Sequence, residues 1–349
     1  MQNGLFGAHF FYPNFHYFYA MKKSAIILVN LGTPESPTAA GVSRFLKLFL
    51  SDRRVVEAPR LLWWFLLRLV IIPLRAKKVA HAYREIWWDE GSPLRVISHR
   101  QVAALKELLN KEYKTQAPLV VDAVTYGNPS IAAVIASLKE KGIDRYIVVP
   151  MYPQYSGSTT GAIYDQLSDI VKGVRDVPDI LTIKSFYDHP EYINALAQRI
   201  REYWEKNGRN KKLLMSFHGI PQEYADKGDP YREHCMATAV ALSEALQLSP
   251  SDWSIGFQSR FGPKQWLEPY TDEQLKKCAK DGVDSVDVVS PAFTADCLET
   301  LEELNISYRQ VFMDAGGLSY NYIPCVNDSP DFTFALFKLT KPFLEINGE

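Results

Sequence analysis

The sequence predicts an α/β fold with two similar, Rossmann-like doubly wound domains, each built on a parallel four-stranded sheet, and a C-terminal helix that packs across them. Eight short apolar runs lack polar–apolar alternation, as is typical of parallel strands buried on both faces. Helical patterns separate most of these runs, which indicates right-handed crossovers between parallel strands. The length of 349 residues accommodates two domains of ordinary size.

The predicted strands divide four and four, with the junction near residues 170–190. They are 25–30, 119–125, 145–150, 180–186, 212–218, 253–258, 285–290 and 309–313. Helical periodicity is clearest over residues 131–141, 192–207, 231–246 and 271–281. We therefore expect an N-terminal domain over residues 21–175, a C-terminal domain over 176–329, and a final helix and tail over 330–349.

Residues 1–20 are expected to be an extension outside the fold. They are rich in Phe, Tyr and His, and they contain neither Lys nor Arg and no continuous apolar run, so they do not resemble a secretory signal. Met21 precedes the first strand directly and is an alternative start. Nowhere does the chain reach the roughly 18–20 uninterrupted apolar residues of a membrane span.

Charge and cysteine content exclude several classes of protein. The 39 basic and 40 acidic residues are balanced, which argues against nucleic-acid binding and against an acidic tail. The four cysteines (Cys235, Cys278, Cys297 and Cys325) form no C-x-x-C pair. They are typical of reduced thiols in a cytoplasmic protein and not of a zinc knuckle or a cluster site.

Nucleotide-binding and hydrolase motifs are absent. The first strand leads into Asn-Leu-Gly-Thr-Pro at residues 30–34 and not into a G-x-G-x-x-G turn, and the chain has no P-loop, H-E-x-x-H or G-x-S-x-G motif. Residues 157–161 (Gly-Ser-Thr-Thr-Gly) form either an anion site at a helix start or simply the beginning of that helix.

His218 is the strongest candidate for a functional side chain. It follows the apolar run 213–217 and is followed at once by Gly219 and Pro221. This places an imidazole at the carboxyl end of a predicted parallel strand, where open α/β sheets bind their ligands. A structural histidine is the alternative, but the glycine allows a ligand to approach the backbone closely.

A second candidate element follows the strand 285–290 and carries several carboxylates. On an α-helical wheel with Asp296 at zero, Glu299 and Glu303 fall near 300° and 340°, and Cys297 falls near 100°. The three carboxylates would then share one face and could pass protons or hold a divalent cation, with Cys297 pointing away. The alternative is an ordinary surface helix whose first turn favours acidic residues.

The most apolar segment spans residues 59–75 and is interrupted by Arg68 and Pro73. A helix that covers the sheet or lines a pocket is the simpler interpretation. The alternative is an exposed apolar lip, over 61–74, that touches a membrane surface.

These segments resemble ferrochelatase, the enzyme that inserts ferrous iron into a porphyrin in the last step of haem synthesis. The resemblance runs from about Ala25 to Pro324. Its motifs are residues 29–34 (Val-Asn-Leu-Gly-Thr-Pro), 49–54 (Phe-Leu-Ser-Asp-Arg-Arg), 91–94 (Gly-Ser-Pro-Leu), 126–129 (Tyr-Gly-Asn-Pro), 150–154 (Pro-Met-Tyr-Pro-Gln), 216–221 (Ser-Phe-His-Gly-Ile-Pro), 257–262 (Phe-Gln-Ser-Arg-Phe-Gly) and 293–300 (Phe-Thr-Ala-Asp-Cys-Leu-Glu-Thr).

The resemblance implies an enzyme, a lyase, that uses Fe²⁺ and protoporphyrin IX as substrates. The family's catalytic histidine maps onto His218 and its key glutamate onto Glu299. We expect His218 to accept pyrrole protons, and Glu299 with Asp296 and Glu303 to relay protons or deliver metal. His218 and Glu299 are the expected iron ligands.

Substrate contacts are expected from two regions. The apolar walls of the porphyrin site should come from 61–74 and from Tyr152 and Tyr155, while Arg53 and Arg54 should pair with the propionates. We expect a cytoplasmic protein, with peripheral contact at the inner face of the membrane through 61–74.

Departures from the family pattern affect three positions. Many relatives carry histidine where this chain has Cys297, and others carry arginine where it has Thr125. Animal forms hold an iron–sulfur cluster through a C-terminal extension that contains cysteine, whereas residues 340–349 contain none. We therefore expect no cluster and no required cofactor.

Several rival functions remain open. A coproporphyrin ferrochelatase would differ only in pocket charge, and a cobalt or nickel chelatase usually relies on more than one histidine. A non-catalytic carrier of tetrapyrrole or metal would not need the carboxylates at Asp296, Glu299 and Glu303. A nicotinamide-dependent dehydrogenase is disfavoured because the glycine fingerprint is missing.

Overall fold

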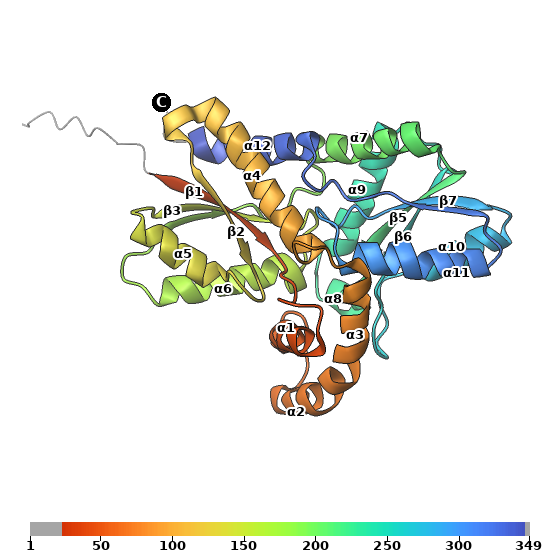
Figure 1. Ribbon diagram of the computed structural model, residues 1–349, viewed down its shortest axis with the longest axis horizontal. Coiled ribbons are helices and arrows are strands. Elements are labelled where there is room, and N and C mark those ends of the chain that lie inside the picture. The colour runs from red at the N-terminus through yellow and green to blue at the C-terminus, as the bar shows by residue number, and fades with distance from the viewer. Residues whose placement is uncertain (1–22, 346–349) are drawn as a thin grey trace, which may run out of the picture.

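The computed structural model describes residues 23–345. The expected extension at 1–20 and the last four residues lie outside this range. Within it, two parallel four-stranded sheets lie side by side with helices on their faces, and this arrangement confirms the predicted α/β fold (Figure 1).

Both sheets have the same topology, with the first strand of each flanked by the second and third. The N-terminal sheet has the order β2-β1-β3-β4, and the C-terminal sheet has the order β6-β5-β7-β8. The strands are β1 (Ser24–Asn30), β2 (Leu119–Val124), β3 (Arg145–Pro150), β4 (Asp179–Thr182), β5 (Lys212–His218), β6 (Trp253–Gln258), β7 (Ser285–Val289) and β8 (Ser319–Tyr322). Because β4 pairs with β3, the N-terminal sheet extends beyond the domain boundary expected at residue 175.

The strand predicted at 309–313 is wrong. These residues belong to a helix, α11 (Tyr308–Asp314), and the eighth strand is β8. The helix buries Phe312 and exposes Arg309, Gln310 and Met313, which is a helical and not a strand-like period. The side-chain amide of Gln310 also donates to Asp314, four residues later.

The helices of the N-terminal half are α1 (Ala39–Ser51), α2 (Arg60–Leu66), η1 (Leu67–Ile71), α3 (Ile72–Ile86), α4 (Pro93–Tyr113), η2 (Lys114–Gln116), α5 (Ile131–Glu140), η3 (Gly157–Gly161) and α6 (Ala162–Lys172). Those of the C-terminal half are α7 (Pro190–Asn207), α8 (Gln222–Asp226), α9 (Tyr231–Ala245), α10 (Thr271–Lys280), η4 (Glu299–Ser307), α11 and α12 (Pro330–Glu345). Segments η1, η3 and η4 are π-helices, in which the backbone hydrogen bonds span five residues.

One hydrophobic core joins the two sheets. It contains side chains from β1 and β3 of one sheet and from β5 of the other, with α4, α7, α9 and α12 packed on them. Helix α12 lies along α4 and α7 in Figure 1, so it packs across both halves as predicted. The guanidinium of Arg145 on β3 donates to the carbonyl of Phe343 on α12, at 3.1 Å.

Helices α1, α2 and α3 form an arm that projects from the body (Figure 1). We call residues 61–74 at its tip the apolar lip. The segment is helical, but its side chains do not cover a sheet: Leu61, Leu69 and Leu74 are 74%, 69% and 73% exposed. Among residues 23–345, no helix is both long enough and apolar enough to cross a membrane.

Candidate active site

His218 is the last residue of β5, beside its register partner Gln258 on β6. Its Nδ1 lies 2.7 Å from the carbonyl oxygen of Gly219. A carbonyl oxygen only accepts hydrogen bonds, so Nδ1 carries the proton of the neutral imidazole. Nε2 is therefore left as the proton acceptor of the ring.

The turn after His218 requires glycine. A Cβ at Gly219 would lie 2.9 Å from the carbonyl oxygen of Gln258 and 3.1 Å from the ring of Trp266. The backbone N–H of Gly219 donates to that same carbonyl at 2.8 Å. This hydrogen bond connects the end of β5 to the end of β6. It also holds Gly219 in place, and the carbonyl of Gly219 is the one that orients the imidazole of His218.

Glu303 lies on η4, and its carboxylate accepts hydrogen bonds from three residues. Gln258 Nε2 donates at 3.2 Å, the backbone N–H and the hydroxyl of Ser259 both donate, and the hydroxyl of Tyr308 donates at 3.0 Å. Burial raises the pKa of Glu303, while the Ser259 hydrogen bond and the charge of His218 act in the opposite direction. The imidazole and this carboxylate therefore lie within electrostatic reach of each other.

Glu299 lies one helical turn before Glu303 and faces the N-terminal half. Burial raises the pKa of Tyr83, Tyr152 and Cys297, and the charge of Glu299 raises all three further. Tyr83 lies on α3, Tyr152 lies in the loop after β3, and Cys297 directly precedes the helix that begins at Leu298. The charge of Glu299 also raises the pKa of Glu303. Glu299 therefore lies between Tyr83, Tyr152 and Cys297 on one side and Glu303 and His218 on the other.

The predicted stripe of three carboxylates is wrong at Asp296. Its buried carboxylate is occupied by donors from Tyr322, Asn327 and Thr300, at 2.5, 2.7 and 3.0 Å. The α-helical wheel does not apply, because the helix begins only at Leu298 and continues as a π-helix. For the same reason, the wheel does not fix the direction of Cys297, and the charge of Glu299 raises the pKa of its thiol in addition to burial.

The four residues expected to bind substrate (Tyr152, Tyr155, Arg53 and Arg54) do not lie together, and they have different partners. Tyr152 lies near Glu299, whereas the ring of Tyr155 contacts the ammonium group of Lys184, 4.7 Å from its centroid. Arg54 forms a two-point ion pair with Asp165, with both N–O distances 2.8 Å. Arg53 is exposed and has no ion pair or side-chain hydrogen bond within residues 23–345.

The glycine-rich segment at 157–161 starts a helix whose N-terminus is already occupied. The carboxylate of Asp229, from the C-terminal half, accepts from the backbone N–H of Gly157 at 2.7 Å and from the hydroxyl of Ser156 at 2.9 Å. The Asp229 carboxylate therefore occupies the place that a bound anion would take. This agrees with the interpretation that residues 157–161 are simply the beginning of a helix.

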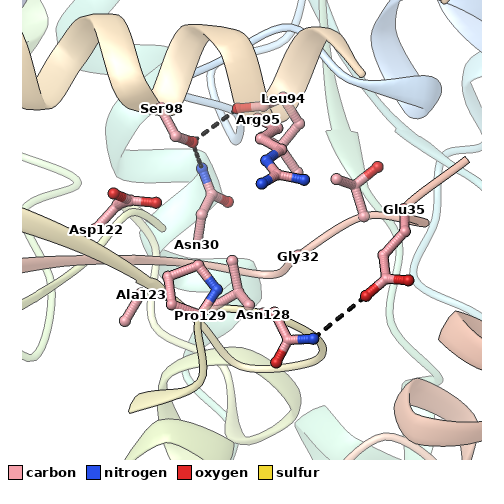
Figure 2. A pocket seen from close by; sticks show the side chains of 12 residues that line it. Asn30, Gly32, Glu35, Leu94, Arg95, Ser98, Asp122, Ala123, Asn128 and Pro129 are labelled. Atoms are coloured by element: carbon pink, nitrogen blue, oxygen red, sulfur yellow. Dashed lines mark hydrogen bonds between the residues drawn. The ribbon is translucent and has the colours of Figure 1, made fainter. Parts of the chain in front are cut away.

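A separate pocket of about 220 Å³ lies at the carboxyl ends of β1 and β2, beside the first turns of α4. Figure 2 shows Arg95, Asp122 and Glu35 around it. None of the predicted site residues lines it. Its carboxylates already have partners, since Asn128 donates to Glu35 at 3.2 Å and His99 lies 3.5 Å from Asp122.

Three residues of the site were missed from the sequence. Gln258 and Ser259 stand at the carboxyl end of a predicted strand, so the rule that selected His218 could have selected them as well. Tyr83 gave no signal, because its place beside Glu299 depends on how the arm folds back toward η4. Leu298 and Leu301 make that contact by packing against the cluster formed by the arm.

The family model for ferrochelatase matches residues 23–343, nearly the whole described chain. The chain belongs to the ferrochelatase family. It is therefore a lyase of the class that inserts iron into porphyrin, and the resemblance noted on residues 25–324 extends into α12, to residue 343.

Curated ferrochelatases are similar over most of their length. One from Acinetobacter baumannii (strain ACICU) is 49% identical over 305 residues, which are 87% of this chain and 90% of that protein. One from Neisseria gonorrhoeae (strain ATCC 700825 / FA 1090) is 46% identical over 319 residues, which are 91% of this chain and 93% of that protein.

Solved structures of other chelatases share the fold at low identity. SirB from Bacillus subtilis with Fe³⁺ has a TM-score of 0.54 and 13% identity, and the match covers 91% of this chain and 94% of that one. The sirohydrochlorin chelatase SirB from Bacillus subtilis subspecies spizizenii, in complex with cobalt, has a TM-score of 0.53 and 12% identity, and covers 93% and 97%. These similarities support the two-sheet architecture alone.

Proposed function

We propose that the chain inserts Fe²⁺ into protoporphyrin IX to give protohaem, and that His218 accepts the pyrrole protons. A free-base porphyrin must lose two pyrrole protons before iron can bind in its plane. The observation that carries this assignment is the contact of Nδ1 with the Gly219 carbonyl, which leaves Nε2 as the acceptor. The ring is thereby oriented for proton transfer before any substrate arrives.

Each proton would pass from Nε2 to the carboxylate of Glu303 and then towards Glu299. Burial raises the pKa of Glu303, which favours the protonated form of this carboxyl group. Asp296 would take no part in this relay, since its carboxylate is bonded to Tyr322, Asn327 and Thr300 and not to the residues at the strand end beside His218. Its role would be to hold the loop before η4.

Iron is a substrate in this scheme and would be held only in passing. Within residues 23–345 there is no group of three or more His, Cys, Asp or Glu side chains arranged to hold a metal ion. Glu299 would supply one ligand, and water the rest, before transfer to the porphyrin nitrogens, because the one free lone pair of His218, at Nε2, accepts the pyrrole protons.

We also propose that the protein carries no resident cofactor. The four cysteines are buried and lie apart in the sequence. Iron and acid-labile sulfide would both be near zero in protein purified without added metal, and stoichiometric sulfide would contradict the proposal.

The porphyrin would lie between Glu299 and His218, with Tyr152 and the base of the arm as apolar walls. Arg53 has a free guanidinium for a propionate, whereas Arg54 is already paired with Asp165. Arg53 would therefore contribute more to porphyrin affinity than Arg54.

We propose that the apolar lip rests on the inner face of the membrane while the body of the protein stays in the cytoplasm. Leu61, Leu69 and Leu74 are largely exposed, Arg68 lies within the lip, and Arg60 and Arg75 flank it. A protruding apolar tip with basic residues is typical of a surface that binds anionic lipid. Protoporphyrin is sparingly soluble in water, so this contact would bring the enzyme close to its substrate.

The test of the function is anaerobic iron insertion followed by absorbance, with protoporphyrin and coproporphyrin compared side by side. We expect turnover with protoporphyrin, and a loss of about 100-fold in kcat for Glu299→Gln, the size expected when a proton-transfer group is removed. Turnover with coproporphyrin alone would select that rival substrate. Porphyrin binding without iron insertion would select the carrier.

A further inference from the structure

The loop that follows β3 belongs to the N-terminal half, but the C-terminal half holds it in place. We call residues 152–157 the Tyr152 loop, because this tyrosine lies near Glu299 in the candidate site. Both Gln154 and Ser156 of the loop are almost fully buried. The position of Tyr152 therefore depends on the contacts that the rest of the loop makes.

Three residues of the C-terminal half bind the Tyr152 loop, one after another. The carboxylate of Asp229 accepts from the last N–H of the loop at 2.7 Å. The hydroxyl of Thr238 on α9 accepts from Nε2 of Gln154 at 2.9 Å. Between these two contacts, the backbone N–H of Tyr155 donates to Nδ1 of His234 at 3.2 Å. His234 and Thr238 are one helical turn apart, so α9 presents both to the loop from one face.

The imidazole of His234 is oriented as a hydrogen-bond acceptor. A backbone N–H only donates, so Nδ1 carries the lone pair and Nε2 carries the proton of the neutral ring. The ring stacks on Tyr187, with centroids 3.8 Å apart and planes inclined by 15°. The carbonyl of Tyr187 accepts from the Thr238 hydroxyl at 2.9 Å, which attaches the stacking partner to α9 as well. The stack therefore directs Nδ1 at the Tyr152 loop.

The surroundings of His234 favour its neutral form. Burial lowers the pKa of His234, and the charge of Lys184 lowers it further. The ammonium group of Lys184 lies 4.7 Å from the ring centroid of Tyr155, the residue that donates to His234. Three nearby carboxylates act in the opposite direction: those of Asp188, Asp229 and Glu233. Protonation of Nδ1 would turn the acceptor into a donor that faces another N–H, and the hydrogen bond would be lost.

We propose that His234, in its neutral form, is a positioning residue that holds the Tyr152 loop in the arrangement that binds porphyrin. This inference rests on the proposed function, in which Tyr152 forms a wall of the porphyrin site. His234 itself need not touch substrate. Without the acceptor at Nδ1, the loop would spend part of its time in other arrangements. The apparent affinity for porphyrin would then fall in proportion to the fraction of protein that keeps the binding arrangement.

Two variants separate the hydrogen bond from the ring stack. His234→Asn loses the ring but keeps an acceptor, because Oδ1 of asparagine can take the place of Nδ1. His234→Phe keeps a ring that can stack on Tyr187 but has no acceptor. We expect His234→Phe to weaken porphyrin binding about 5-fold, as for the loss of one neutral hydrogen bond, and His234→Asn to stay within about 2-fold of wild type.

The measurements are fluorescence quenching of protoporphyrin at about pH 8, where His234 is neutral, and kcat for anaerobic iron insertion. The kcat at saturating porphyrin should change less than about 2-fold in both variants, since His234 acts on binding alone. Weaker binding by His234→Asn than by His234→Phe would overturn the proposal, because it would show that only the stack matters. His234→Leu, which also lacks an acceptor, replaces His234→Phe should the latter fail to fold.

The pH dependence tests the requirement for the neutral form. The pKa of His234 is lowered from its ordinary value of 6.5, so the hydrogen bond is complete above that pH and is lost as the pH falls through the lowered pKa. Wild type should therefore lose porphyrin affinity relative to His234→Asn between about pH 6.5 and pH 5. The ratio of the two affinities removes the titration of His218 and of the porphyrin, which both proteins share. A ratio that does not change with pH would overturn the proposal.

Wild type assayed for iron insertion separates the two levels of the account. Wild-type protein that neither binds porphyrin nor inserts iron would overturn the proposed function and this inference together. Active wild type, with equal porphyrin affinity in wild type, His234→Asn and His234→Phe, would overturn the role of His234 alone.

Discussion

At the scale of single residues, the strand-end rule predicts the position of His218 but not its surroundings. Among seven histidines, His218 alone follows an apolar strand and precedes glycine, and these features can be read from the sequence. The hydrogen bonds of Ser259 to Glu303 depend on one left-handed dihedral angle, and serine is not a residue that signals such an angle. Tyr83 reaches Glu299 only through the tertiary position of the arm.

Asp296 provides a prediction at this scale. Asp296→Asn places an amide nitrogen where Tyr322, Asn327 and Thr300 all donate, so one of these buried donors loses its acceptor. We expect the free energy of unfolding in urea to fall by about 2 kcal/mol. The kcat of the remaining folded protein should stay within about 3-fold of wild type, well short of the loss expected for a proton relay. A large fall in kcat with unchanged stability would restore Asp296 to the relay.

At the scale of elements, apolar runs predict all the strands except one edge strand, β8. Seven of the eight strands were located from such runs, whereas β8 reads Ser-Tyr-Asn-Tyr and buries only alternate residues. The apolar content of residues 309–313 was mistaken for that strand. The helix begins only at Leu298 and continues as the π-helix η4, so a wheel drawn at 100° per residue does not apply to Asp296 and Cys297, which precede it.

The apolar lip carries the prediction for this scale. Replacing Leu61 and Leu69 together by aspartate should weaken binding to phosphatidylglycerol vesicles about 10-fold or more, because both apolar contact and attraction to anionic lipid are lost. Leu318→Asp is the control, since Leu318 is equally exposed, at 74%, in the other half of the protein. Vesicle co-sedimentation that is the same for both variants would contradict a membrane role of the arm.

At the scale of the whole molecule, the two sheets and the final helix could be predicted from the sequence. The shared core and the contacts that join the two halves could not. The repeated strand–helix pattern implies two halves that could fold separately. In the structure, one core connects them, Asp229 of one half caps a helix of the other, and Gln101 on α4 donates to the carbonyl of Thr294 at 2.8 Å. Such contacts between distant segments leave no periodic signal in the sequence.

This integration predicts a single unfolding transition. Leu336 on α12 is fully buried in the shared core, so Leu336→Ala should lower the free energy of unfolding by about 2–5 kcal/mol. Circular dichroism and tryptophan fluorescence should report the same shifted midpoint in urea. Two separate transitions, of which only one shifts, would show that the halves are independent.

The central claim is that Nε2 of His218 takes the pyrrole protons. The most direct measurement is anaerobic iron insertion by His218→Ala, with porphyrin affinity measured by fluorescence quenching and with imidazole added as a replacement base. We predict normal porphyrin binding, a loss in kcat of about 100-fold or more, and partial recovery with imidazole. Near-normal turnover by His218→Ala with normal porphyrin binding would contradict the account.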